Sequence, residues 1–256
     1  MTATRLAFRQ ARYEQISFWR NPAAAFFTFA FPVVFLVLMT ALLGNGTATL
    51  PNGEETKASS YYIASILSFS VITATFTNLA MGTTIARDNG ILKRIRGTPV
   101  PTVAYLGGRV LSSLAVTGIL IVIVMAFGVV VYDVSLPGDT ALAFVVTTAI
   151  GAASFCALGL AITAVIPNAD AAPAIVNAVI LPLLFVSGIF IPIDDGPVWI
   201  ETVAGVFPVR PYLVASIDSF LGVGDGWNVS ALVVLSLWGL FGLVAAARWF
   251  SWEPRR

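Results

Sequence analysis

Residues Val110–Val131 read VLSSLAVTGILIVIVMAFGVVV, a run that contains no charged side chain. An α-helix rises about 1.5 Å per residue, so a run of this length covers the ~30 Å hydrocarbon core of a bilayer. Within lipid, every backbone N–H and C=O must find a partner inside the protein, which leaves helices and closed barrels as the only spanning structures. The run therefore predicts a transmembrane helix.

The regions on both sides of this run have the same apolar character. Hydrophobic residues make up 58% of the 256 residues and charged residues 11%, against about 25% charged residues in soluble domains. Six segments are long enough to cross a bilayer: Ala24–Leu43, Tyr61–Ile85, Val110–Val131, Ala141–Ile166, Pro173–Ile193 and Val229–Trp249. We expect an all-α polytopic membrane protein, with one transmembrane domain over residues 1–256 and the six spans within residues 24–249.

The distribution of Lys and Arg predicts the orientation of these spans. If both termini are cytoplasmic, twelve of the 14 basic residues lie on the cytoplasmic side, and Lys57 and Arg210 lie outside. The twelve are Arg5, Arg9, Arg12, Arg20, Arg87, Lys93, Arg94, Arg96, Arg109, Arg248, Arg255 and Arg256. Because basic residues concentrate in cytoplasmic segments, we expect cytoplasmic N- and C-termini and an even number of spans.

Residues 1–22 precede the first span and predict an amphipathic helix that lies along the membrane surface. The segment Thr4–Arg20 contains neither Pro nor Gly. On a helical wheel its four arginines, Arg5, Arg9, Arg12 and Arg20, fall on one side with aromatic and apolar side chains flanking them. Basic residues beside an apolar face are typical of interfacial helices.

The residue types that carry most enzymatic chemistry are scarce. The chain has no histidine, and its single Cys156 lies within an apolar run, so the commonest general base and a Cys-based metal site are both missing. It also lacks the G-x-x-x-x-G-K-[ST] loop that cradles the phosphates of ATP. We expect a chain that is not an enzyme, that binds no cofactor or metal, and that has no nucleic-acid partner.

A basic segment directly after the second span, residues 86–102, reads ARDNGILKRIRGTPVPT. Gly90 can end one helix and Thr98-Pro99 can start another, which predicts a short helix on the cytoplasmic surface between them. The alternative is a solvated loop whose cations only set the topology and contact anionic lipid. The charges by themselves do not separate these two interpretations.

A second polar interruption, residues 177–195, reads NAVILPLLFVSGIFIPIDD at the end of the fifth span. Pro182 and Ser187-Gly188 weaken the helical hydrogen-bond ladder, which is tolerated where neighbouring helices or a cavity satisfy the freed groups. The alternative is a bend needed only for packing. Asn78 and Asn177 are candidates for a cavity lining, because a polar side chain in lipid needs a partner or water.

These two segments, their order and the six-span arrangement resemble the ABC-2 type permease family, and within it the daunorubicin-resistance-like drug-efflux permeases. The family pattern E-R-E-x-G-T-L-E-x-L-x-x-T-P is matched in kind by Arg87, Asp88, Gly90, Leu92, Thr98 and Pro99, whereas Lys93 stands where an acidic residue is frequent. The pattern L-P-L-x-F-x-S-G-x-F-x-P is met by Leu181, Pro182, Leu183, Phe185, Ser187, Gly188, Phe190 and Pro192. The resemblance covers essentially the whole chain.

The resemblance implies a set of residues that couple the chain to a separate ATPase, which would hold the ATP and magnesium. They are Arg87, Asp88, Gly90, Ile91, Leu92, Lys93, Arg94, Arg96, Thr98 and Pro99. Two ATPase subunits and a second permease chain, identical or different, would complete the complex. Short helices that re-enter the membrane from outside are expected between the fifth and sixth spans, near Pro197–Phe207 and Pro211–Phe220.

The resemblance also implies a transport path at the interface between two such chains, lined from the first and fifth spans. The candidate path residues are Phe31, Phe35, Asn78, Asn177, Pro182, Phe185, Ser187, Gly188 and Phe190. The expected activity is export of amphipathic drug-like or lipid-like molecules across a bacterial cytoplasmic membrane, in contact with membrane lipid. Two alternatives stay open: a glycan or polysaccharide exporter of the same superfamily, and a membrane scaffold without transport activity.

Overall fold

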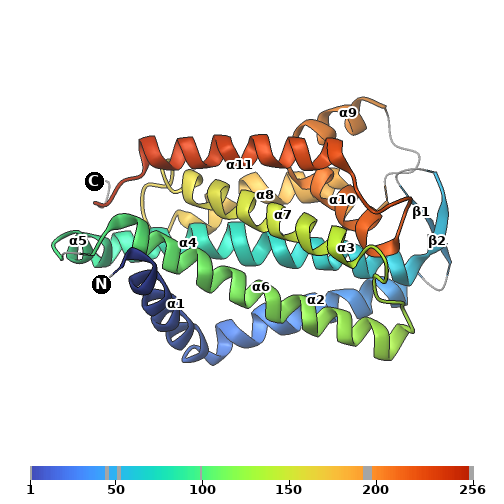
Figure 1. Ribbon diagram of the computed structural model, residues 1–256, viewed down its shortest axis with the longest axis horizontal. Coiled ribbons are helices and arrows are strands. Elements are labelled where there is room, and N and C mark those ends of the chain that lie inside the picture. Colours follow the sequence, from blue (N-terminus) through green and yellow to red (C-terminus); the bar gives the residue numbers. More distant parts are fainter. Residues whose placement is uncertain (1, 44–45, 51–52, 99, 193–197, 254–256) are drawn as a thin grey trace.

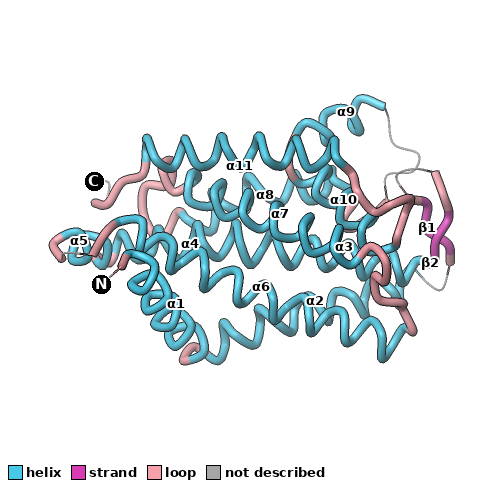
Figure 2. Tube along the Cα trace, viewed as in Figure 1, coloured by secondary structure: helices cyan, strands magenta, loops and turns pink. Residues whose placement is uncertain are grey.

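The structure, a computed structural model, describes residues 2–43, 46–50, 53–98, 100–192 and 198–253. Most helices run along one axis and form an elongated bundle (Figure 1). The start of α1, the end of α11 and the short helix α5 lie at one end, called here the α5 end, while strands β1 and β2 mark the opposite, hairpin end (Figures 1 and 2).

The elements in chain order are α1 (Ala3–Trp19), α2 (Pro22–Leu43), β1 (Thr47–Thr49), β2 (Glu55–Lys57), α3 (Ala58–Ile72), the π-helical segment η1 (Thr73–Thr77), α4 (Asn78–Asp88), α5 (Ile91–Arg96), α6 (Thr102–Tyr132), α7 (Ala141–Ile162), α8 (Ala172–Ser187), α9 (Val198–Val206), α10 (Val209–Leu221) and α11 (Val229–Trp249). The two strands pair antiparallel, with Thr47 opposite Lys57. The expected all-α membrane fold is confirmed.

Five helices of the described chain are long and apolar enough to cross a bilayer, and they coincide with five of the six predicted spans. They are α2, the continuous unit Ala58–Asp88, α6, α7 and α11. The remaining predicted span, Pro173–Ile193, corresponds to α8, which ends earlier, at Ser187. It ends there because Gly188 adopts a left-handed backbone conformation, φ 95°, a common helix stop. Residue 193 lies outside the described residues.

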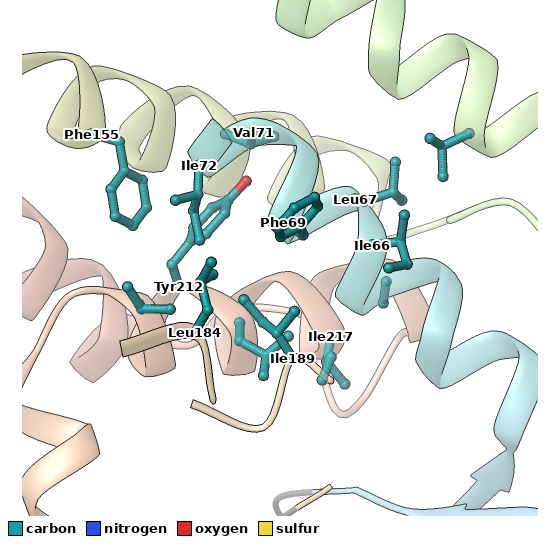
Figure 3. Close-up of a cluster of buried hydrophobic side chains, with 14 of the residues drawn as sticks. Ile66, Leu67, Phe69, Val71, Ile72, Phe155, Leu184, Ile189, Tyr212 and Ile217 are labelled. Carbon is teal, nitrogen blue, oxygen red and sulfur yellow. The ribbon is translucent and has the colours of Figure 1, made fainter. Parts of the chain in front are cut away.

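The unit α3–η1–α4 is the central helix of the bundle. It is the most deeply buried of the five candidate spans and packs against α2, α6, α7 and α10. Figure 3 shows Ile66, Leu67, Phe69 and Ile72 of α3 within the main buried cluster. Some hydroxyls on this unit bond back to their own helix, as Thr75 Oγ1 donates to the Val71 carbonyl at 2.6 Å, so those side chains are satisfied without a cavity.

The predicted N-terminal helix is present as α1, which lies obliquely beside the bundle (Figure 1) and packs along α6. The contact is close because Gly108 of α6 has no side chain: a Cβ there would lie 2.8 Å from the Ala7 carbonyl oxygen. Gln15 adds hydrogen bonds from Nε2 to the carbonyl and hydroxyl of Ser112, at 2.8 and 2.9 Å. Helix α1 is therefore fixed to the bundle.

The short helices α9 and α10 form a re-entrant pair. Tyr212, in the first turn of α10, lies against Gly151 midway along α7, whereas Gly222, at the end of α10, lies near Thr140 at the hairpin end. The last residue before the α9–α10 turn, Phe207, stacks on Trp238 of α11 with ring centroids 6.0 Å apart. The pair thus enters from the hairpin end and turns back inside the bundle.

Candidate coupling surface and transport path

Helix α5 follows α4 directly at the α5 end. The break between them is at Gly90, whose φ of 69° is accessible to glycine at little cost. The helix ends where the Thr98 hydroxyl donates to the Ile95 carbonyl at 2.6 Å. The predicted short helix between Gly90 and Thr98 is therefore present. Pro99, predicted to belong to the coupling segment, lies outside the described residues.

One face of α5 packs onto the chain itself. Leu92 is fully buried in a cluster with Ala86 and Tyr105, and Ile95, Phe250 and Trp252 pack around it. The Leu92 side chain is covered by its own bundle in this arrangement, and its predicted role in coupling to a partner stays a prediction. Ile91, in contrast, is exposed. Helix α5 is thus held in place by an apolar anchor.

Arg87 does not lie on the outer surface with the other predicted coupling cations. Its side chain is 1% exposed, and its guanidinium donates to the backbone carbonyls of Thr163, at 2.8 Å, and of Ile166. The carbonyls at the end of a helix lack intrahelical donors and attract cations, and α7 ends here. The structure therefore corrects the docking assignment of Arg87: it joins α4 to the α7–α8 turn.

Asp88 strengthens the same junction from the next position. Its Oδ2 accepts a hydrogen bond from the Ala169 backbone N–H at 3.0 Å. With Arg87, it fixes the end of α4 to the α7–α8 turn through two consecutive residues. Any movement of α5 is in this way connected to two further membrane helices.

The exposed side of α5 is electropositive. Lys93, Arg94 and Arg96 all have exposed side chains. Arg96 approaches Glu253 at 4.0 Å, but both side chains are more than 60% exposed, and such surface pairs contribute little. The three cations and the exposed Ile91 form a surface that is complementary to a partner surface with acidic residues around an apolar centre.

An aromatic cluster joins α2, α3 and the end of α8 on the hairpin side of the bundle. Phe35 lies 5.2 Å from Phe190, Phe31 lies 6.0 Å from Phe35, and Phe185 lies 5.0 Å from Phe190, between ring centroids. Four candidate path residues are thus brought together. Phe69 of α3 completes the cluster, 5.8 Å from Phe190; sequence reasoning missed it, because it lies in a span with no distinguishing motif.

The cluster is partly open at its edge. Phe31 is 51% and Phe185 63% exposed, whereas Phe35 and Phe190 pack against the main core. Pro182, on α8, is also exposed, and Asn177 is half-buried one to two turns before it. The outward aromatic faces offer apolar contact area next to the break in α8.

The break at Ser187-Gly188 is held by two residues that sequence reasoning did not assign to the path. The Tyr61 hydroxyl donates to the Gly188 carbonyl at 2.7 Å, and Arg210 Nη1 donates to the Ser187 carbonyl at 3.4 Å. Arg210 also forms an ion pair with Glu201 of α9. One sequence feature could have identified Arg210 as a candidate: it is one of only two basic residues on the predicted outer side.

Asn78 lies apart from the other candidate path residues. It is exposed on α4 and lines a hollow between α1, α4 and α6, whereas the aromatic cluster joins α2, α3 and α8. The structure therefore does not bring Asn78 together with Phe185 or Phe190.

A comparison with protein families matches residues 8–221 to the ABC-2 type transporter model. The chain belongs to the ABC-2 type transporter family. Two curated relatives carry the name "Probable multidrug ABC transporter permease YbhR", from Escherichia coli strain K12 and from E. coli O157:H7. Each is 26% identical over 186 residues, which cover 72% of this chain and 47% of the relative.

The family match covers both segments that carried the resemblance, from the end of α4 through α8 and the re-entrant pair. This ABC-2 type chain spans about half the length of the curated relatives it matches. Membership of a transporter family agrees with the set of apolar helices and with their arrangement as a multi-pass membrane bundle.

Proposed function

We propose that this chain is the membrane-spanning subunit of an ATP-driven exporter, and that it works with separate ATPase subunits. The observation that carries the proposal is the construction of the α5 end. A cationic helix is exposed to solvent there, yet it is anchored by Leu92 and follows directly after the buried Arg87 and the hydrogen-bonded Asp88. A cationic surface needed only for topology would require no such anchoring.

The anchoring gives a mechanical route into the bundle. Movement of α5 displaces α4 directly, and Arg87 and Asp88 pass it to the α7–α8 turn. Helix α8 carries that displacement to its end at Ser187-Gly188, beside the aromatic cluster. Packed helices change arrangement as bodies rather than bend continuously, so closure of the ATPases would shift α8 against α2.

Two permease chains, identical or different, and two ATPases would form the complex, with ATP and magnesium bound by the ATPases. The termini would be cytoplasmic in a bacterial inner membrane, because the α5 end carries most of the basic residues. The aromatic faces of Phe31 and Phe185 suit amphipathic molecules, and the name of the relatives, a probable multidrug ABC transporter permease, supports a drug-like substrate.

The decisive experiment is co-expression with an ATPase whose reading frame adjoins that of this chain. We expect the two to co-purify from detergent extracts, and we expect ATP hydrolysis by the complex to rise with amphipathic drugs. An ATPase that binds but responds to none of a broad panel of drugs and lipids would contradict the substrate class. Failure of every candidate ATPase to co-purify with the folded chain would contradict the exporter.

A further inference from the structure

A hollow of ≈ 570 Å³ lies between α1, the start of α2, α4 and α6. Its size is within the ~300–1,000 Å³ range of small-molecule sites. One wall is formed by the N-terminal helix and the opposite wall by two membrane helices, so the hollow lies where the α5 end of the bundle meets the membrane surface. It contains no residue of the aromatic cluster, and it touches α5 only at Ile91.

The polar part of the hollow contains one buried cation and one anion. The Arg109 side chain is 10% exposed, and its Nη1 lies 3.9 Å from Glu14 Oε1 and 3.0 Å from the Tyr105 hydroxyl. Its other terminal nitrogen rests on Gly82 of α4, where an added Cβ would lie 2.6 Å from Nη2. Glu14 is oriented by Gln10, whose Nε2 donates to Oε1 at 3.0 Å.

Two polar groups in the hollow are left without partners. Within the described part of the chain, Arg109 Nε has no hydrogen-bond acceptor although it is buried. Asn78 faces the same hollow one helical turn deeper than Gly82, and no described residue bonds to its amide. Buried polar groups in proteins are nearly always paired, so the buried Arg109 Nε indicates a ligand that brings a hydrogen-bond acceptor, and the exposed Asn78 amide offers that ligand a second polar contact.

The hollow is amphipathic along its length. Arg109 lies seven residues, or about 10 Å, from the start of α6, and the deeper lining comes from Val116, Ala74 and Phe18. Phe18 and Phe29 pack beside Ala74 and Val116 there. A ligand would therefore place its charged group toward the α5 end and its apolar chain toward the bundle centre.

We infer that this hollow binds the headgroup and upper acyl chain of a zwitterionic phospholipid whose ammonium group donates hydrogen bonds. The phosphate lies at Arg109, the ammonium at Glu14, and the glycerol ester region beside Asn78. Charge complementarity selects this class: an anionic lipid meets repulsion from Glu14, and a cationic amphiphile meets repulsion from Arg109. A headgroup with both charges leaves neither side chain unpaired in a medium of low dielectric.

The test uses the delipidated full chain in detergent, without any ATPase, titrated with dioleoyl phosphatidylethanolamine or dioleoyl phosphatidylglycerol and read by native mass spectrometry. We expect one phosphatidylethanolamine to bind about tenfold more tightly than phosphatidylglycerol, since a hydrogen bond to a charged group contributes about 1.4 kcal/mol or more. Because no ATPase is present, the result is independent of the proposed export function.

Glu14→Gln is the informative variant. It removes the ammonium partner and leaves Arg109 unopposed, so we expect phosphatidylethanolamine to bind more weakly and phosphatidylglycerol more tightly, which reverses the preference. A variant that merely unfolds loses both lipids. Arg12→Gln, on the exposed side of the same helix, removes one charge without touching the hollow and is expected to keep the original preference.

Asn78→Phe provides a second test that leaves the charged pair intact. The larger ring fills the deeper part of the hollow, so both lipids are expected to bind more weakly while the helical circular-dichroism signal stays unchanged. Equal binding of the two lipids by the unmodified chain would overturn the inference. So would a Glu14→Gln variant that changes both affinities by the same factor, or an Asn78→Phe variant that binds both lipids as before.

Discussion

The guanidinium of Arg87 and the backbone carbonyl of Thr163 are 2.8 Å apart and both are buried. This hydrogen bond joins the end of α4, the helix that leads into the cationic α5, to the end of α7. A buried charge is costly unless it is paired, and here the pairing is with helix-end carbonyls that lack their own donors. The bond therefore serves stability and the connection between helices at the same time.

Replacement of Arg87 should lower the stability of the protein and weaken the connection between α4 and α7. In Arg87→Gln the Thr163 and Ile166 carbonyls lose their donor, and each buried group left unsatisfied costs about 1–3 kcal/mol. We expect a lower melting temperature in detergent, and weaker stimulation of a bound ATPase by substrate. Arg87→Lys should rescue only part of the loss, because an ammonium does not reproduce the two-pronged geometry of a guanidinium.

Arg94→Gln is the matched control for that change. Arg94 is exposed on α5, so its replacement should leave the melting temperature unchanged within the error of the measurement. If Arg94→Gln lowered the melting temperature as much as Arg87→Gln, the structural role assigned to Arg87 would be wrong.

Charge reversal on the exposed side of α5 should act on association rather than on folding. We expect Lys93→Glu with Arg94→Glu to reduce co-purification with the ATPase at least tenfold, because like charges across an interface cost several kcal/mol. Membrane insertion and the melting temperature should not change. Arg12→Glu with Arg20→Glu gives the same change in net charge at exposed positions of the N-terminal segment, and its co-purification should stay at the level of the unmodified chain.

The sequence predicted the parts of the fold that depend on length and composition. Val110–Val131 lies wholly within α6, and Gly90 separates α4 from α5. The Ser187-Gly188 pair was interpreted as a weak point within a longer span, whereas it ends α8. A glycine in the left-handed conformation can either bend a helix or end it. Whether the helix ends depends on the groups that donate hydrogen bonds to the freed carbonyls. Those groups, Tyr61 and Arg210, are far away in the chain.

The candidate site could be predicted only for residues whose own type and position in the sequence suggest a role. The exposed cations of α5 were found in this way, but Arg87 was grouped with them because its partners are main-chain carbonyls 76 and 79 positions away. Such carbonyls have no side-chain signature. Asn78 was placed in the path for its polarity alone, and only the packing of α1 onto α6 reveals that it faces a different hollow.

The hydroxyl of Tyr61 is predicted to stabilise the end of α8. Tyr61→Phe keeps the ring in the core but leaves the Gly188 carbonyl without this donor, which lies 2.7 Å away. We expect a loss of about 1–2 kcal/mol in the free energy of unfolding, measured by thermal denaturation in detergent. Tyr132→Phe, at the end of α6, removes a hydroxyl from a half-buried tyrosine and should have no comparable effect.

The re-entrant pair depends on a close approach between Tyr212 and Gly151. A methyl group at Gly151 would lie 3.0 Å from Cζ of Tyr212 and closer still to Cε2 and Cδ2, and Tyr212 is fully buried, so it cannot move aside. Gly151→Ala should therefore cost about 1–3 kcal/mol, as overpacking of a core does, and lower the melting temperature. Gly118→Ala, where no atom lies within 4 Å, should not lower it.

The double variant Gly151→Ala with Tyr212→Leu separates steric overlap from other effects of the added methyl group. Substitutions of residues in contact have non-additive effects on stability, and the smaller leucine leaves room for the methyl group. The double variant should therefore lose less stability than the sum of the losses of the two single variants. Additive losses, measured in the same detergent, would mean that Tyr212 does not lie over Gly151. In that case α10 would not begin inside the bundle, and the α9–α10 pair would have to lie at its surface instead.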